Sequence, residues 1–307
     1  MPERAEPSTA ATPTDSGTVW PVVRRRSLPE EEARYAERRA PELCRDSTQD
    51  VGVLLVGHGT REPSGVEQTG ELCRLVETSL RHRGFGGAFA LAFLELAQPS
   101  IAAALPVVRD GAIRRLIVAP LMLFAAGHVR RDIPHEVRTA LGDHRLPAVR
   151  YLDAFNDDPA VLRLSLRREQ DALGLPPDRD DATEETYYLF VARGNRDPEA
   201  LAATRRVLEL RARQSRRRHY GLAYLAMARP TLDEALDRAA RGPWRRVIVQ
   251  PHLLFRGLLE RELRTKVAQR AQQRPDITWV VTDVLGPDST LADSLAANIS
   301  AAITPQP

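Results

Sequence analysis

The block RRLIVAPLMLF at residues 114–124 returns as RRVIVQPHLLF at residues 245–255, 131 positions later. The same distance separates LAFLELAQPSIAAAL (91–105) from LAYLAMARPTLDEAL (222–236). One register shared by two separate blocks indicates an internal duplication. The sequence therefore predicts two copies of one fold, and a length of 307 residues is sufficient for two domains of ordinary size.

Within each copy, short apolar runs alternate with amphipathic stretches, a pattern typical of parallel strands linked by helices. The expected strands are residues 51–56, 88–95, 114–123, 147–152, 186–192, 220–228, 245–255 and 277–286. The expected helices are residues 63–83, 98–109, 129–142, 159–173, 197–214, 230–241, 257–273 and 288–303. The predicted fold class is α/β, with two Rossmann-like three-layer αβα domains, each built on a parallel sheet of about four strands.

The expected domains are residues 49–175 and 187–304, joined by a polar linker at residues 176–186. Residues 1–48 are predicted to form a disordered or partly helical tail, because their first part is rich in Pro, Ser, Thr and Ala. The segment LPEEEARYAERRAPEL within this tail is a candidate for one charged helix.

Composition narrows the class of protein. The two cysteines, Cys44 and Cys73, are too few for a disulfide framework or a cysteine zinc site, which suits a reducing compartment. No apolar run approaches the roughly 20 residues that span a bilayer, and the N-terminus lacks the apolar core of a secretory signal. We therefore expect a cytoplasmic protein without a membrane partner.

The net charge is only +3, and no nucleic-acid-binding motif accompanies the arginines at residues 216–218. We expect that run to be a solvated helix end and predict no nucleic-acid partner.

Three polar side chains follow successive expected strands of the first copy. His58 follows the first strand, Glu95 ends the second, and His128 follows the third and opens a helix. Because sites in open parallel sheets form at the carboxyl ends of strands, one crevice could collect all three. Two imidazoles and a carboxylate suit a divalent first-row metal. Taken singly, the histidines also fit turn residues, and Glu95 fits a solvated strand end.

The second copy offers an internal comparison for these residues. GHGTREP (57–63) aligns with ARGNRDP (192–198), so that Arg193 stands at the position of His58. Likewise, Ala226 replaces Glu95, and Leu259 replaces His128 if no gap intervenes. The surrounding scaffold residues match, so the loss of all three side chains favours a single chemical site in the first copy.

Other histidines are weaker candidates. His252 stands opposite Leu121 of the first copy and is expected to be either a core residue or a crevice-lining residue. His135 precedes Glu136, but no second histidine completes an H-E-x-x-H zinc motif. His82, His144 and His219 are expected in solvated helix ends or loops.

The segments LLVGHGTREPSG, FLELAQPSI and VAPLMLFAAGHVRRDIP resemble three characteristic segments of the sirohydrochlorin chelatases. These are class II tetrapyrrole chelatases of the cobalamin and sirohaem pathways. The similarity covers about residues 50–285 and includes the duplicated long form. It implies an enzyme (a lyase) that inserts Co²⁺ or Fe²⁺ into sirohydrochlorin, with no permanently bound cofactor, since the metal is itself a substrate. It also implies that His58 and His128 bind the metal, that His58 accepts a proton, and that Glu95 occupies the family's acidic position.

The resemblance further implies how the macrocycle is held. The segment against the macrocycle would comprise Met122, Leu123, Phe124, Ala125, Ala126 and Gly127. Because sirohydrochlorin bears many carboxylates, arginines near the site are expected to bind them. We expect Arg61 and Arg193 to bind these carboxylates. Further arginines near the expected site are Arg130, Arg131, Arg196 and Arg256. Small residues would let a flat ring approach the backbone at Gly57, Gly59 and Gly127.

Two other functions fit parts of the pattern. Histidine phosphatases carry an R-H-G motif after a first strand, but Gly57 stands here where their arginine would be. A non-catalytic metal carrier could use the same His58 and His128 without turnover. Oligomeric state is open between a monomer and a homodimer.

Overall fold

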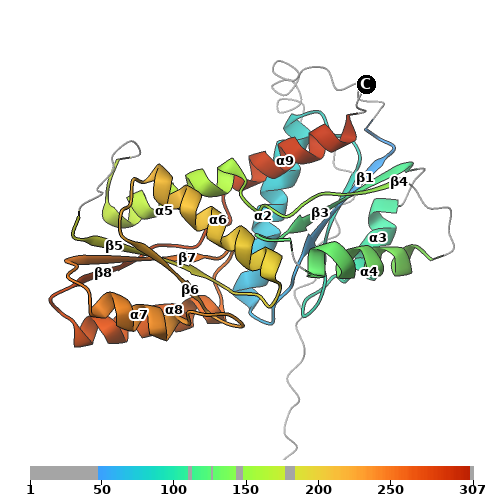
Figure 1. Cartoon of the computed structure of the whole chain (residues 1–307). Helices are drawn as coiled ribbons and strands as arrows, with labels where there is room; N and C mark the ends of the chain where they lie inside the picture. Colours follow the sequence, from blue (N-terminus) through green and yellow to red (C-terminus); the bar gives the residue numbers. More distant parts are fainter. Residues whose placement is uncertain (1–47, 110–112, 126, 143–147, 177–183, 305–307) are drawn as a thin grey trace, which may run out of the picture.

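The computed structural model describes residues 48–109, 113–125, 127–142, 148–176 and 184–304. Two four-stranded sheets, all of whose strand pairs are parallel, form the two halves of the molecule (Figure 1). The first sheet has the order β2-β1-β3-β4 and comprises β1 (Val51–Gly57), β2 (Ala88–Phe93), β3 (Arg115–Leu121) and β4 (Ala148–Tyr151). The second repeats this order as β6-β5-β7-β8, with β5 (Thr186–Ala192), β6 (Tyr220–Tyr224), β7 (Arg246–His252) and β8 (Thr278–Val281). The predicted duplicated α/β fold is confirmed. The candidate tail helix, Ala126 and His144 lie outside the described residues.

Helices cover both faces of each sheet. They are α2 (Pro63–His82), α3 (Ile101–Arg109), the π-helix η2 (His128–Asp132), α4 (Ile133–Leu141), α5 (Pro159–Leu173), α6 (Pro198–Gln214), α7 (Leu232–Ala240), α8 (Leu258–Gln273) and α9 (Ser289–Ile303). No helix within the described ranges has the length and apolar character needed to cross a membrane.

The central strand β1 is buried on both sides because successive side chains point to opposite faces of the sheet. Leu54 and Val56 pack with α3 and α4, whereas Val53 and Leu55 pack with α2 and α9. Its continuous apolar sequence is the form expected of a parallel strand with helices on both faces. The thiol of Cys73 of α2 is buried among the apolar side chains between α2, α9 and this sheet.

The last helix of each copy packs on the sheet of the other copy. Helix α5 follows β4 but lies beside α6 on the second sheet, whereas α9 follows β8 and lies along α2 on the first sheet (Figure 1). Leu295 and Ile299 of α9 belong to the same apolar cluster as Leu72 and Val76 of α2. The two halves are therefore joined by an exchange of helices, a feature that the alternating pattern alone did not predict.

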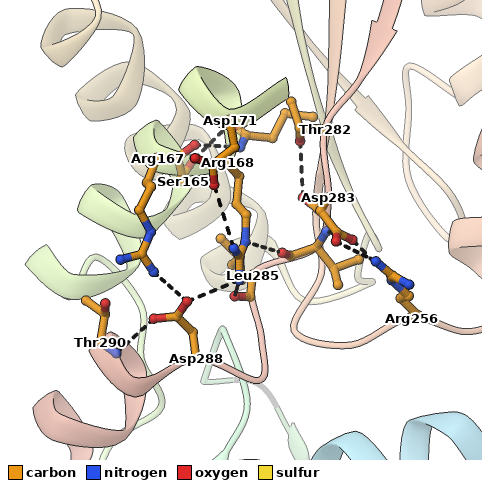
Figure 2. A network of polar contacts seen from close by, with 12 residues as sticks. Ser165, Arg167, Arg168, Asp171, Arg256, Thr282, Asp283, Leu285, Asp288 and Thr290 are labelled. Atoms are coloured by element: carbon orange, nitrogen blue, oxygen red, sulfur yellow. Dashed lines mark hydrogen bonds and ion pairs between the residues drawn. The ribbon is translucent and has the colours of Figure 1, made fainter. Parts of the chain in front are cut away.

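Ion pairs join the exchanged helices where they cross. Arg167 and Arg168 of α5 both reach Asp288, which accepts a hydrogen bond from the Thr290 N–H at the start of α9 (Figure 2). Arg168 also donates to the carbonyl oxygens of Val284 and Leu285, at 2.9 and 3.0 Å. The guanidinium of Arg168 thus holds the segment that leads from β8 into α9.

Helix α5 is anchored on the second sheet by a buried acid. Glu169, only 1% exposed, forms ion pairs with both Arg211 of α6 and Arg217. The prediction that residues 216–218 form a solvated helix end is therefore wrong for Arg217, because its charge is neutralised inside the protein by Glu169. Next to these two ion pairs, the Ser165 hydroxyl of α5 donates a hydrogen bond to Gln250 Oε1 of β7 at 2.8 Å.

Some predicted strands extend too far at their carboxyl ends. β2 ends at Phe93 rather than at residue 95, and β6 ends at Tyr224 rather than at residue 228. The chain turns after each strand, and Leu96 and Met227 take positive φ angles of 62° and 60°. The Phe93 N–H bonds to the carbonyl of the returning chain at Pro99, at 2.8 Å, while the Leu94 and Glu95 N–H groups still bond to the carbonyls of Gly57 and His58. β7 and β8 likewise end early, at His252 and Val281.

Candidate active site

A cavity of about 450 Å³ lies between the halves, at the point where the strand order of each sheet reverses. In the first sheet this point lies between β1 and β3, whose last residues, Gly57 and Leu121, are paired in register. In the second sheet Ala192 of β5 and His252 of β7 are paired in the same way. Ligands of open α/β folds bind at such switch points, and here the two switch points line one cavity.

His58 and Glu95 come together on the cavity wall from the first half. The Glu95 N–H donates to the His58 carbonyl at 3.0 Å, and His58 Nδ1 lies 3.3 Å from Glu95 Oε1. The His58 side chain is 21% exposed and the Glu95 side chain 48% exposed. Glu95 lies in the turn two residues beyond β2, not in the strand as predicted. The turn returns its carboxylate to the imidazole at the end of β1.

Gly59 creates the close approach between these two segments. It has φ = 95°, and a Cβ atom there would lie 1.6 Å from the Glu95 carbonyl oxygen. Gly194 repeats this geometry in the second half, with a Cβ position 1.8 Å from the Ala226 carbonyl. The turn is therefore common to both copies, whereas the imidazole and carboxylate occur in the first alone.

Gly57 and Gly59 line the cavity, whereas Gly127 is not among the lining residues. Gly57 and Gly127 also have close neighbours inside the protein. A Cβ on Gly57 would lie 3.2 Å from side-chain atoms of Phe93 and Thr69. On Gly127 it would lie 2.9 Å from the Arg131 guanidinium.

His128 begins η2, the π-helical turn that leads into α4. It therefore follows β3 and starts a helix, as predicted, although its side chain is outside what the structure describes. Among the described residues, no group of three His, Cys, Asp or Glu side chains is arranged to hold a metal ion. The described part of the predicted metal site is thus the pair of His58 and Glu95.

The segment predicted to face the macrocycle lines the cavity in its first half. Met122, Leu123 and Phe124 form part of the wall. Ala125 and Gly127 are not among the lining residues, and the Ala125 N–H instead donates to Asn156 Oδ1 at 3.2 Å.

The predicted arginines divide into distinct groups. Arg193 is exposed and lines the cavity, facing it from the loop after β5. Arg61 is exposed but is not among the lining residues. Arg256 also lines the cavity, and its guanidinium pairs with Asp283 through Nη2–Oδ2 at 2.5 Å and Nε–Oδ1 at 3.2 Å (Figure 2). Arg130 forms an ion pair with Glu199 of α6.

Contacts between the halves flank the cavity. Glu62, at the start of α2, pairs with Arg261 of α8 at 2.8 Å, and Gln68 accepts a hydrogen bond from the Arg256 N–H at 2.8 Å. Arg130 of η2 and Glu199 at the start of α6 form the corresponding contact with the roles of the halves exchanged. Arg130 and Arg261 are 131 positions apart, so the two arginines are equivalent in the duplication, whereas their acidic partners are not.

His252 is a cavity residue for which the sequence left two readings open, and both apply. It ends β7, is 1% exposed, and forms part of the cavity wall. Burial lowers the pKa of its imidazole to about 3, so the ring is neutral near pH 7. Sequence reasoning missed two apolar cavity residues, Leu96 and Leu258, which are 50% and 64% exposed. Their exposure depends on loop conformation, which periodicity does not encode.

The fold and cavity define a duplicated α/β protein with one cavity lined by two related halves. The CbiX family model matches residues 52–172 and again residues 187–302. The chain therefore belongs to the CbiX family, and its resemblance to the sirohydrochlorin chelatases is confirmed.

Similar proteins agree with this assignment. A sirohydrochlorin ferrochelatase of Priestia megaterium is 26% identical over 251 residues, covering 80% of this chain and 88% of that protein. A sirohydrochlorin cobaltochelatase of the same organism is 23% identical over 239 residues, covering 76% and 74%. The structure of SirB from Bacillus subtilis with Fe³⁺ has a TM-score of 0.70 at 20% identity, covering 81% of this chain and 94% of that chain. The structural likeness shows the fold.

Proposed function

We propose that the protein is a sirohydrochlorin chelatase that inserts Co²⁺ or Fe²⁺ into sirohydrochlorin. The observation that carries the proposal is the pair of His58 and Glu95 on the wall of a cavity formed by both halves. Family membership gives the substrate class, since two relatives are named for iron and cobalt insertion into this macrocycle. Imidazole and carboxylate accept either ion, so the proposal covers both metals.

Metal delivery is assigned to His58, His128 and Glu95. A neutral imidazole presents a lone pair to a first-row metal, and a carboxylate adds a compensating negative charge. Because His58 Nδ1 faces Glu95 Oε1 at 3.3 Å, a proton on Nδ1 would leave the lone pair on Nε2. Three protein donors leave coordination positions open for macrocycle nitrogens, whereas four protein ligands would oppose release of the metal.

Proton removal is assigned to His58. Insertion of M²⁺ breaks two pyrrole N–H bonds, forms metal–nitrogen bonds and releases two protons. Once His58 has passed the metal to the macrocycle, its free Nε2 can accept one of these protons near neutral pH, because histidine has an ordinary pKa of about 6.5. The other proton leaves to solvent. Glu95 next to the ring would stabilise the imidazolium that forms.

The macrocycle is placed in the cavity between the halves. Met122, Leu123 and Phe124 supply apolar wall for a flat ring, and Arg193 supplies a cation on the opposite half. A guanidinium binds carboxylates through paired hydrogen bonds. The replacement of His58 by Arg193 in the second copy thus fits a half that binds anions rather than metal.

The test is metal insertion by purified protein, followed as the change in sirohydrochlorin absorbance on addition of Co²⁺ or Fe²⁺. We expect His58→Ala to lower the rate at least about 100-fold, the usual effect of losing a positioned acid–base group. His128→Ala should lower it at least about ten-fold, through weaker metal binding. Glu95→Gln should lower it less, because the ligand set keeps both histidines.

His135→Ala serves as the matched control, since His135 is an exposed histidine on α4. Undiminished insertion by both His58→Ala and His128→Ala would refute the site. Metal binding without any insertion by the unmodified protein would instead indicate a carrier, and phosphate release without a tetrapyrrole would indicate a phosphatase.

A further inference from the structure

His252 stands at the switch point of the second half, where the first half has Leu121. The side chain is almost fully buried, yet it belongs to the cavity wall. Its ring packs against Phe190 at a centroid distance of 4.6 Å and against Phe124 at 5.5 Å. Phe124 comes from the first half, so the imidazole lies where both halves meet the cavity.

Neither Nδ1 nor Nε2 of His252 has a hydrogen-bond partner in the part of the chain that the structure describes. A buried polar group without a partner opposes folding, and the great majority of such groups are satisfied. The position does not require histidine for packing, because the first copy carries Leu121 in the same register position. Retention of an unsatisfied imidazole at a cavity wall therefore points to a ligand that completes its hydrogen bonding.

His252 is separate from the metal and proton chemistry. It forms no metal-holding group with His58 and Glu95 among the described residues. The low proton affinity of the buried ring also makes it a poor acceptor for a pyrrole proton. Its partner must therefore be a group away from the centre of the macrocycle.

The surroundings favour a carboxylate as that partner. The neutral imidazole offers one N–H donor, and the cavity wall of the second half carries the cation Arg193 together with Arg256, whose charge Asp283 offsets. The rings of Phe124 and Phe190 lie 5.5 and 4.6 Å from the imidazole, so its surroundings are apolar. A hydrogen bond to a charged group is stronger in such an apolar setting than at the surface.

We infer that His252 is a substrate-binding residue of the second half, which donates a hydrogen bond to a peripheral carboxylate of the tetrapyrrole. The inference rests on the proposed function. It assigns the second copy a contact of its own with the substrate, separate from the metal site of the first copy.

The experiment titrates the full-length protein with metal-free sirohydrochlorin and measures Kd from macrocycle fluorescence. His252→Leu, which restores the residue of the first copy, should raise Kd about ten-fold without lowering Tm. His252→Gln keeps a donor and should stay within about three-fold of the unmodified protein. In insertion assays His252→Leu should raise KM for sirohydrochlorin but leave kcat and KM for Co²⁺ unchanged.

His219→Leu is the control, because His219 lies outside the cavity lining and pairs with Glu184. An unchanged Kd in His252→Leu, with normal binding by the unmodified protein, would overturn the role of His252 alone. Equal losses of affinity in the Leu and Gln variants, each with a lowered Tm, would show a structural role and also overturn it. Failure of the unmodified protein to bind sirohydrochlorin would overturn the proposed function as well.

Discussion

At the residue scale, one glycine determines whether the two candidate catalytic side chains can meet. Gly59 combines a positive φ with a position at which a Cβ atom would overlap the Glu95 carbonyl oxygen. The same arrangement at Gly194 shows that the turn belongs to the scaffold rather than to the chemistry. The two copies thus share this turn and differ in the side chains around it.

Gly59→Ala should destabilise the protein by about 3–5 kcal/mol, from left-handed strain plus steric overlap with the Glu95 carbonyl. Gly174→Ala is the control, because Gly174 has φ = 65° but nothing within 4 Å of its Cβ position. It should lose only about 1–2 kcal/mol, from the backbone strain alone. Denaturant unfolding at pH 7 measures both, and equal losses would contradict the steric argument.

His252 makes stability depend on pH. Its pKa is about 3 in the folded protein, because of burial, and about 6.5 in an unfolded chain. The unfolded state therefore binds more protons between these values, so the contribution is complete above pH 6.5 and is lost as the pH falls toward 3. Between pH 7 and pH 4.5 the unmodified protein should lose about 3 kcal/mol more free energy of unfolding than His252→Leu. Parallel losses in the unmodified protein and in His252→Leu would contradict the prediction.

At the element scale, α5 is held on the second sheet by charge as well as by apolar packing. Glu169 faces the two guanidinium groups of Arg211 and Arg217, all of them buried. A buried ion pair adds little net stability, but removal of one partner leaves an uncompensated charge. We therefore expect this network to favour the second sheet for α5.

Glu169→Ala should lower the free energy of unfolding by about 3–5 kcal/mol, because both buried arginines lose their counter-ion. Asp171→Ala on the same helix is the control, since Asp171 is 60% exposed and lies 3.9 Å from Arg168. It should leave stability nearly unchanged, as exposed ion pairs contribute little. Similar effects of the two substitutions in chemical denaturation would refute the role of the network.

At the scale of the whole molecule, the exchange of α5 and α9 makes each half depend on the other. One face of the first sheet is covered by α2 and α9, and α9 comes from the C-terminal half of the chain (Figure 1). Asp158 caps α5 and Asp288 caps α9 through equivalent hydrogen bonds. Their carboxylates accept from the N–H groups of Ala160 and Thr290. Each helix therefore begins in the same way and differs in the sheet that it covers.

A chimera of residues 48–157 joined to residues 288–304 should fold by itself, because α9 then follows β4 directly and covers the first sheet. The fragment of residues 48–175 should not fold stably, since α5 would lack the arginines that neutralise Glu169. Thermal unfolding followed by circular dichroism distinguishes them, with a cooperative transition expected for the chimera alone. A fragment as stable as the chimera would show that the exchange is unimportant for folding.

The fold class and the His58–Glu95 pair could be predicted from the sequence, because periodicity and duplication are properties of the chain itself. Apolar runs at the spacing of βαβ units determine a parallel sheet, and the register between the copies identified His58 and Glu95 as residues that only one half retains. Strand ends were less predictable. The apolar residues continue beyond Phe93 and Tyr224, and only the turn that follows ends each strand.

Tertiary structure decided the features that depend on contacts between distant segments. Which sheet α5 and α9 cover, the burial of Arg217, and the position of His252 on a cavity shared by both halves all depend on residues more than 30 positions apart. Local pattern specifies which face of an element is apolar, but not which of two similar sheets that face will meet. Because the halves descend from one duplicated unit, their sheets offer α5 and α9 similar surfaces. The buried charges and the crossing contacts at Asp288 distinguish them.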